Sequence, residues 1–323
     1  MPKSRQLEAL IAQLNQIRSA PTSELGLATL SQIMASRHSI AIAQAARLVG
    51  EFEIRALMPD LVSAFDRLMV KAKDRDPGCR GKAAIADSRY RLEHADEGRF
   101  LQGMRHVQWE PTWGAQVDTA PKLRGLCALG LVRMNYGNAL IELADLLADP
   151  EVEARIGAAR AIAYSENPFG VALLRLRIKV GDTPTVVGEC MAALLQLSVP
   201  DTLPLAATLL HAGTKESDPR EVIERAEVIA LVLGESRLPA ALPVLQTWWQ
   251  TITHRDLRQT GLLAIATLRQ AAALQWLLQL LAEGSLRDAK AALEALRLYQ
   301  QENFLWSKVQ AILEQRPELT FDP

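Results

Sequence analysis

LRGLCALGLV, at residues 123–132, is the clearest copy of a ten-residue phrase that recurs along this chain. ARIGAARAIA at residues 154–163 and LRQTGLLAIA at residues 257–266 repeat its order of apolar, basic, small and apolar positions. Weaker copies begin at Ala41, Cys79, Val186, Glu224 and Leu286. The copies lie roughly 30 to 45 residues apart, and this spacing is typical of stacked helical repeats.

Each copy of the phrase predicts an amphipathic helix, because its first, fifth, eighth and ninth positions fall on one helical face. A second apolar stretch precedes most copies and predicts the first helix of a pair. These stretches begin at Leu57, Ala139, Leu203, Ala241 and Leu274. No stretch shows sustained period-two alternation with β-branched residues, so strands are not expected.

We therefore predict an all-α fold, a right-handed α-α superhelix of about eight helix pairs that forms a single domain over residues 1–323. A leading helix is expected within residues 1–20, and the repeats within residues 21–300. Residues 301–323 are expected to form a C-terminal cap, since the ends of a repeat stack need covering. The pattern is interrupted at about 94–118, which we interpret as an insertion.

Composition limits the function classes. The chain has 36 Lys and Arg against 37 Asp and Glu, so it lacks the broad positive field that drives non-specific nucleic-acid binding. No apolar run approaches the roughly 18 residues of a membrane span, and the first residues lack a secretory signal pattern. We expect a soluble, cytoplasmic protein without membrane contact. The three cysteines are far apart and no histidine recurs in phase with them, which indicates packing residues and no metal site.

The repeat pattern resembles the HEAT-repeat family, including its bacterial HEAT-like subgroup of the phycobiliprotein-lyase type. The resemblance covers about Thr22 to Gln300 and rests on prolines in first helices, on Arg-x-x-Ala-Ala cores in second helices and on turn dipeptides. These dipeptides are Asp76-Pro77, Asp149-Pro150, Asn167-Pro168 and Asp218-Pro219. It implies that acidic turn residues pair with the basic second position of the phrase, here Asp76 with Arg80 and Asp149 with Arg155.

The interrupted segment, from about His94 to Asp118, contains the best candidates for function. It concentrates polar and aromatic residues, namely His94, His106, Trp109, Glu110, Trp113 and Asp118. Three interpretations stay open: a connector whose tryptophans cover a helix edge, a binding loop, or a catalytic loop. His106 and Glu110 have the spacing of an acid–base pair on a helix, but Pro111 disfavours a helix there.

Glycine recurs early in four successive second helices, at Gly81, Gly125, Gly157 and Gly188. Each costs roughly 1 kcal/mol relative to alanine, so a compensating role is expected. Either a ligand or partner approaches these helices closely, or neighbouring helices pack tightly there. Both interpretations stay open.

The function that we predict is a non-catalytic scaffold that binds a protein or peptide partner on its central concave face and on the inserted loop, without a cofactor. Trp109 and Trp113 would supply anchoring area, and Arg124 and Arg155 charged hydrogen bonds.

Two alternatives remain beside the scaffold. Trp109, Trp113 and Asp118 could imitate the grouping used by alkylpurine DNA glycosylases with HEAT-like repeats, which would make this a nucleic-acid-acting protein. A phycobilin or tetrapyrrole lyase resembles the chain through repeat type alone. Deoxyhypusine hydroxylases use His-Glu pairs as iron ligands, and no His-Glu dipeptide occurs in this sequence.

Overall fold

The protein is described by a computed structural model that covers residues 2–215 and 219–319. The described residues form nineteen α-helices and one two-stranded sheet, which confirms the all-α class. Asp218 of a predicted turn and residues 320–323 of the predicted cap lie outside the described residues. In the ranges that the structure covers, no helix combines the length and apolar character needed to cross a bilayer.

Sixteen helices form eight consecutive pairs, as the sequence predicts, and each second helix carries one copy of the phrase. The pairs are α2 (Glu24–Met34) with α3 (Ser39–Glu51), α4 (Met58–Met69) with α6 (Arg80–Arg91), α7 (Glu97–Met104) with α8 (Pro121–Arg133), α9 (Ala139–Leu147) with α10 (Val152–Tyr164), α11 (Gly170–Val180) with α12 (Pro184–Leu197), α13 (Val199–His211) with α14 (Arg220–Glu235), α15 (Ala241–Thr251) with α16 (Arg255–Thr267), and α17 (Ala271–Glu283) with α18 (Leu286–Leu296).

The remaining helices lie at the ends and in the links. α1 (Pro2–Ile17) precedes the first pair, and α19 (Asn303–Gln315) follows the last, at the positions expected for the leading helix and the cap. The short α5 (Ala72–Arg75) lies between α4 and α6. Four single 3₁₀ turns complete the helical structure, at Arg55–Leu57, Pro77–Cys79, Arg297–Tyr299 and Pro317–Leu319.

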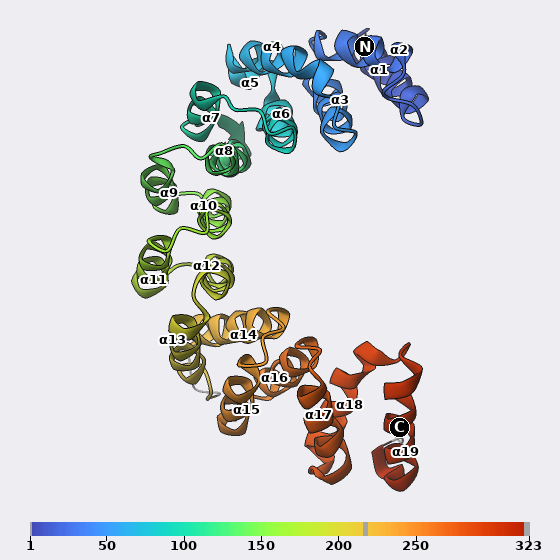
Figure 1. Cartoon of the computed structure of the whole chain (residues 1–323), viewed down its shortest axis with the longest axis vertical. Coiled ribbons are helices and arrows are strands. Elements are labelled where there is room, and N and C mark those ends of the chain that lie inside the picture. The colour runs from blue at the N-terminus through green and yellow to red at the C-terminus, as the bar shows by residue number, and fades with distance from the viewer. Residues whose placement is uncertain (1, 216–218, 320–323) are drawn as a thin grey trace. The chain divides into compact units, whose positions relative to one another are not determined.

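The chain divides into two compact units, unit 1 (Met1–Asn167) and unit 2 (Pro168–Pro323). In unit 1 the second helices α3, α6, α8 and α10 pack side by side on the inner side of the unit's curve, and the first helices form the outer layer (Figure 1). In unit 2, α12, α14, α16 and α18 pack in the same succession. That one continuous right-handed solenoid joins all pairs stays a prediction.

The buried core is built from the small and apolar positions of the phrase. Its fifth position holds a small residue in most copies, and Ala45, Cys127, Ala158 and Cys190 are all fully buried there. Cys79 is buried too, and burial raises the pKa of its thiol to about 12, so it stays protonated at neutral pH. The predicted packing role of the cysteines is therefore confirmed.

The expectation that the chain has no strands is wrong at the interruption. β1 (Trp109–Thr112) and β2 (Ala115–Asp118) form an antiparallel hairpin, in which Trp109 lies opposite Asp118. Its two-residue turn is Trp113-Gly114, and Gly114 has φ +80°, a conformation that glycine adopts without strain. Four-residue strands are too short to show alternation in the sequence.

The predicted insertion at 94–118 also contains a regular repeat helix. Residues 97–104 form α7, which packs on α8 as the first helix of that pair. The Asp96 carboxylate caps this helix by accepting a hydrogen bond from the backbone N–H of Arg99. The segment without a counterpart in the other pairs is therefore shorter, at residues 105–120.

Candidate functional site

The hairpin presents apolar side chains to solvent. Trp113 in the turn is fully exposed, and Trp109 in β1 is 51% exposed. Val107 and Val117, before and within the hairpin, are each about half exposed as well. Exposed tryptophans grouped on one element are unusual on a soluble surface and offer large contact areas to a partner. Trp109 and Trp113 thus lie on the same hairpin, and both are exposed.

The end of the hairpin is fixed by a buried carboxylate. Asp118 Oδ1 accepts hydrogen bonds from the backbone N–H groups of Gln108 (2.9 Å) and Ala120 (3.0 Å). Its other oxygen, Oδ2, accepts from Arg124 Nη1 at 2.6 Å, and both side chains are almost fully buried. The same Nη1 donates to the backbone oxygen of His106 at 3.0 Å. One ion pair therefore ties both strands of the hairpin to α8.

A second buried cluster lies beside the first strand and centres on Gln108. The fully buried Lys82 places its Nζ 2.8 Å from Gln108 Oε1 and 3.2 Å from Asp76 Oδ2. Gln108 Nε2 donates to the backbone oxygen of Asp76 (2.9 Å) and to Glu110 Oε1 (2.6 Å). Gly78 N donates to Glu110 Oε1 at 2.7 Å. The hairpin is thereby bonded to the turn before α6 as well as to α8.

Two carboxylates that hold the hairpin, those of Asp118 and Glu110, are ionised at neutral pH. Burial alone would raise the pKa of Asp118, but hydrogen bonds from Gln108, Ala120 and Arg124 outweigh it and hold that pKa below its usual range. Burial would also raise the pKa of Glu110, but hydrogen bonds from donors that include Gln108 and the Gly78 backbone outweigh it and lower that pKa. Both groups therefore favour the charged form.

His106 and Glu110 do not form an acid–base pair in this arrangement. Burial lowers the pKa of His106, so the imidazole is neutral at neutral pH. Its Nε2 lies 3.2 Å from Gln108 Oε1, and among the contacts of the described residues none joins it to Glu110. Both side chains contact Gln108 on the hairpin's anchored side. The geometry thus offers no catalytic proton transfer between them.

The two predicted arginines are occupied within the protein. Arg124 binds the Asp149 carboxylate of the following pair, with Nη2–Oδ1 at 2.9 Å and Nε–Oδ2 at 2.8 Å. Arg155 is buried and donates to the backbone oxygens of Asp149 and Pro150 at 2.7 and 2.8 Å. Pairing between adjacent repeats is therefore present at Arg124. These contacts favour a structural role for both arginines.

The predicted pair of Asp76 with Arg80 is wrong. Asp76 is buried and accepts from the backbone N–H groups of Gly81 and Lys82, both at 2.9 Å, while Arg80 is exposed. The reason is the turn before α6, where Gly78 and Cys79 both have positive φ angles, so that Asp76 caps the helix. Lys82 takes the place of Arg80 as the charged partner.

The four glycines lie against neighbouring helices. A Cβ atom on Gly125 would lie 3.0 Å from Gly157 Cα, and one on Gly157 would lie 2.6 Å from Gly125 Cα, so α8 and α10 meet glycine to glycine. Gly81 faces Leu68 and Asp76, and Gly188 faces Val228 of α14. These contacts favour the packing interpretation over close approach of a ligand.

Sequence analysis does not identify three buried residues that hold the hairpin, namely Asp76, Lys82 and Gln108. Lys82 occupies the fourth position of a weak phrase copy, and Gln108 stands in the irregular segment directly before Trp109. Asp76 is recognisable as a turn residue but not as the partner of Lys82. The only signal was a lysine in an otherwise apolar stretch, KAAIA at residues 82–86, since a buried lysine needs a partner.

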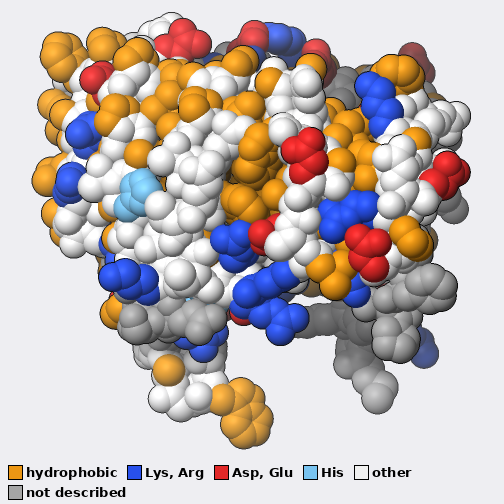
Figure 2. Space-filling model, turned by 90° about the horizontal axis from the view of Figure 1, so that it is seen from below, with side chains coloured by type: hydrophobic (Ala, Val, Ile, Leu, Met, Phe, Trp, Pro, Cys, Tyr) orange, Lys and Arg blue, Asp and Glu red, His pale blue; other side chains and the backbone are white. Residues whose placement is uncertain are grey.

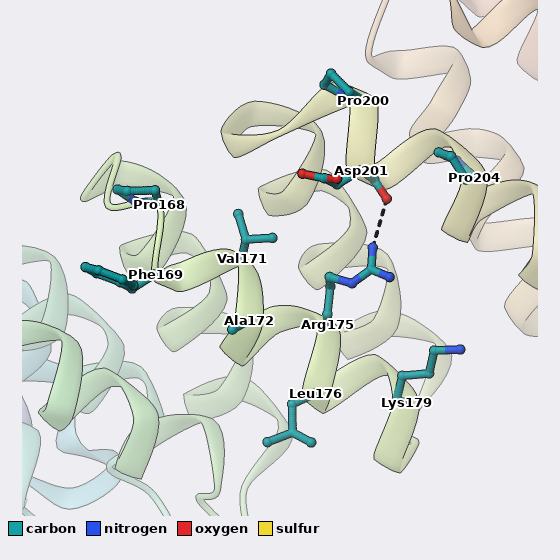
Figure 3. Close-up of a pocket in the computed structure, with 10 residues that line it drawn as sticks. All are labelled: Pro168, Phe169, Val171, Ala172, Arg175, Leu176, Lys179, Pro200, Asp201 and Pro204. Carbon is teal, nitrogen blue, oxygen red and sulfur yellow. Dashed lines mark hydrogen bonds between the residues drawn. The ribbon is translucent and has the colours of Figure 1, made fainter.

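A second surface feature lies in unit 2, between α11 and α13 (Figure 3). It is an open hollow of about 890 Å³ with mostly apolar walls, including the exposed Phe169. Arg175 and Lys179 extend from the same side of α11, and Arg175 Nη1 donates to the backbone oxygen of Asp201 at 2.8 Å. The hollow contains no group of side chains arranged for chemistry.

Comparisons with known proteins leave the family open. No family model matches the chain, and no curated protein matches it. Among solved structures, human deoxyhypusine hydroxylase in complex with glycerol is similar with a TM-score of 0.31 and 15% identity, over 83% of this chain and 91% of that chain. The complex of CpcE and CpcF of phycocyanin lyase from Nostoc sp. PCC7120 is similar with a TM-score of 0.35 and 14% identity, over 88% and 94%. TM-scores below 0.5 support no conclusion about function.

Proposed function

We propose that this protein is a non-catalytic scaffold that binds a protein or peptide partner through the hairpin of residues 109–118. The observation that carries the proposal is the exposure of Trp109 and Trp113 on an element that buried ion pairs hold in place. Binding energy at protein interfaces is concentrated in a few aromatic and arginine side chains that enter pockets of the partner. Trp113 is the best such anchor on this hairpin.

The anchoring network supports this proposal by reducing the cost of binding. A loop that becomes ordered on association loses conformational entropy, which subtracts from affinity. Here Asp118, Gln108 and Glu110 are bonded to the helical scaffold before any partner arrives. We assign Arg124 and Lys82 to this positioning role, Arg155 to the turn that contains Asp149, and the tryptophans to contact.

The proposal includes a HEAT-like repeat type and a cytoplasmic location. Paired helices with small fifth positions and an arginine–aspartate pair between repeats support a HEAT-like scaffold. Free, buried cysteines are compatible with the cytoplasm.

The nucleic-acid alternative gains no support from the hairpin. Asp118 is buried and bonded to Arg124, so it is not available beside the tryptophans to act on a base. On the face drawn in Figure 2, Lys and Arg side chains lie among acidic and apolar ones. For a lyase, no residue of this chain offers a specific argument.

Replacing both tryptophans tests the scaffold. The full chain and its Trp109→Ala/Trp113→Ala variant are used as baits, captured proteins are identified by mass spectrometry, and each protein that the parent captures is purified. We expect its dissociation constant, measured by calorimetry, to rise at least about thirtyfold in the variant, since an anchor residue contributes about 2 kcal/mol or more.

Phe304→Ala is the matched control, because Phe304 is an exposed aromatic side chain on α19 in unit 2. This control should bind as the parent does. An equal affinity of parent and double variant for every purified partner would refute the proposal. Since both tryptophans are exposed, the double variant should keep the parent's thermal stability.

A further inference from the structure

Unit 2 contains a basic hollow that the hairpin proposal does not use. It has a volume of about 960 Å³ and lies along α16 and α18, with Trp306 and Leu313 of α19 on one side. Basic side chains dominate its charged lining, at Arg255, Arg258, Arg287, Lys290 and Arg297, against the acidic Asp288 and Glu294. This local excess of positive charge contrasts with the formal charge of −1 of the whole chain.

Two arginines at the second position of the phrase each bind a carboxylate of the following repeat. Arg258 stands at the second position of the phrase and binds Asp288 of the following second helix at 2.7 Å, while its guanidinium lies 4.1 Å from the ring centre of Trp249. Arg124 in unit 1 binds Asp149 of the following pair in a comparable way. In both cases the next repeat provides the acid.

Arg287 occupies the same phrase position in α18, and the next helix of the described residues is the single α19. It is exposed, and among residues 2–215 and 219–319 no ion pair or hydrogen bond holds its side chain. Arg255 lies about one helical turn before Arg258 in α16 and is exposed in the same hollow. Its side chain too has no ion pair or hydrogen bond with a described residue. Two guanidinium groups thus face solvent beside the half-buried Trp306.

We infer that this hollow binds an acidic segment of a partner protein. One carboxylate of that segment binds Arg287 as Asp288 binds Arg258. A neighbouring carboxylate of the segment contacts Arg255. Arginine binds carboxylates in a bidentate, oriented manner. Apolar side chains of the same segment pack on Trp306 and Leu313. Asp288 and Glu294 in the lining disfavour a nucleic-acid backbone, which presents one continuous line of negative charge.

The test uses arrayed short peptides in which Glu or Asp alternates with apolar residues, probed with the full-length chain. The best peptide is then labelled with fluorescein, and its dissociation constant is measured by anisotropy. Arg287→Glu should weaken binding at least about tenfold, because a repelling charge replaces an attracting one. Arg220→Glu is the matched control, since Arg220 is a highly exposed arginine of unit 2 outside the hollow.

Several outcomes would overturn the inference. These are an array without a binder, a binder that Arg287→Glu leaves unaffected, and a single-stranded oligonucleotide that binds the hollow more tightly than any peptide. Loss of self-association in Arg287→Glu, seen by analytical ultracentrifugation, would instead assign the hollow to a second copy of this chain. Trp109→Ala/Trp113→Ala should leave peptide binding unchanged, so failure here and failure of the hairpin proposal are distinguishable.

Discussion

At the scale of single residues, the hairpin depends on charges that are removed from water. Arg124 and Asp118 form an ion pair with almost no exposure, and Lys82 and Asp76 form another. Removing one partner of such a pair leaves the other charge buried without compensation, which is far more costly than the pair itself is favourable. The position of the exposed tryptophans therefore depends on buried residues.

Acid should loosen this anchor. The pKa of Asp118 and that of Glu110 are lower in the folded protein than the ordinary values of about 3.9 and 4.3. Their contribution to stability is therefore complete above those ordinary values and is lost as the pH falls through the folded ones. In urea titrations below about pH 4, we expect the stability of Asp118→Asn to fall less steeply with pH than that of the parent. Equal slopes would contradict the assignment.

At the scale of elements, the second helices could be predicted because small and apolar residues recur in the phrase at helical spacing. The hairpin could not, because its strands have four residues each and its stability comes from distant partners such as Lys82 and Arg124. The Asp76–Arg80 pair failed for a local reason, since two residues with positive φ turn the chain before α6. Trp109 and Trp113 could be named from the sequence because they lie in the segment that departs from the repeat, and their role in binding stays a prediction.

The contact of α8 with α10 gives a prediction at this scale. Gly157→Ala would place a Cβ atom 2.6 Å from Gly125 Cα, which is backbone and cannot turn aside. We expect a loss of about 1–3 kcal/mol in the free energy of unfolding, although alanine favours helix by about 1 kcal/mol. Gly98→Ala in α7 is the control, since a Cβ atom there meets nothing within 4 Å, and it should be neutral or stabilising. Chemical denaturation measures the free energy of unfolding of both variants, and equal stability of Gly157→Ala and Gly98→Ala would refute the packing role.

At the scale of the whole molecule, the two proposed binding surfaces belong to different compact units. The hairpin and all the residues described as anchoring it lie in unit 1, while the basic hollow lies in unit 2. The sequence predicts a single repeat domain with an insertion at about 94–118, and the division after Asn167 has no counterpart in the phrase, whose copies continue on both sides.

A fragment of residues 1–167 should therefore fold and keep the hairpin function. Every ion pair and hydrogen bond named for the hairpin is internal to that fragment. We expect helical circular dichroism, a sigmoidal urea transition and the parent's affinity for a hairpin partner. A fragment that shows a non-cooperative transition would contradict this, as would one that folds but binds more weakly than the full chain.

The burial of all three thiols has a practical consequence. Cys79, Cys127 and Cys190 are enclosed in the core, where maleimides do not reach them. Gln116→Cys, at an exposed position of β2, would then provide a single accessible thiol and leave both tryptophans in place. A photo-cross-linker attached to this thiol would capture covalently a partner that docks on the hairpin, without any change to the native cysteines.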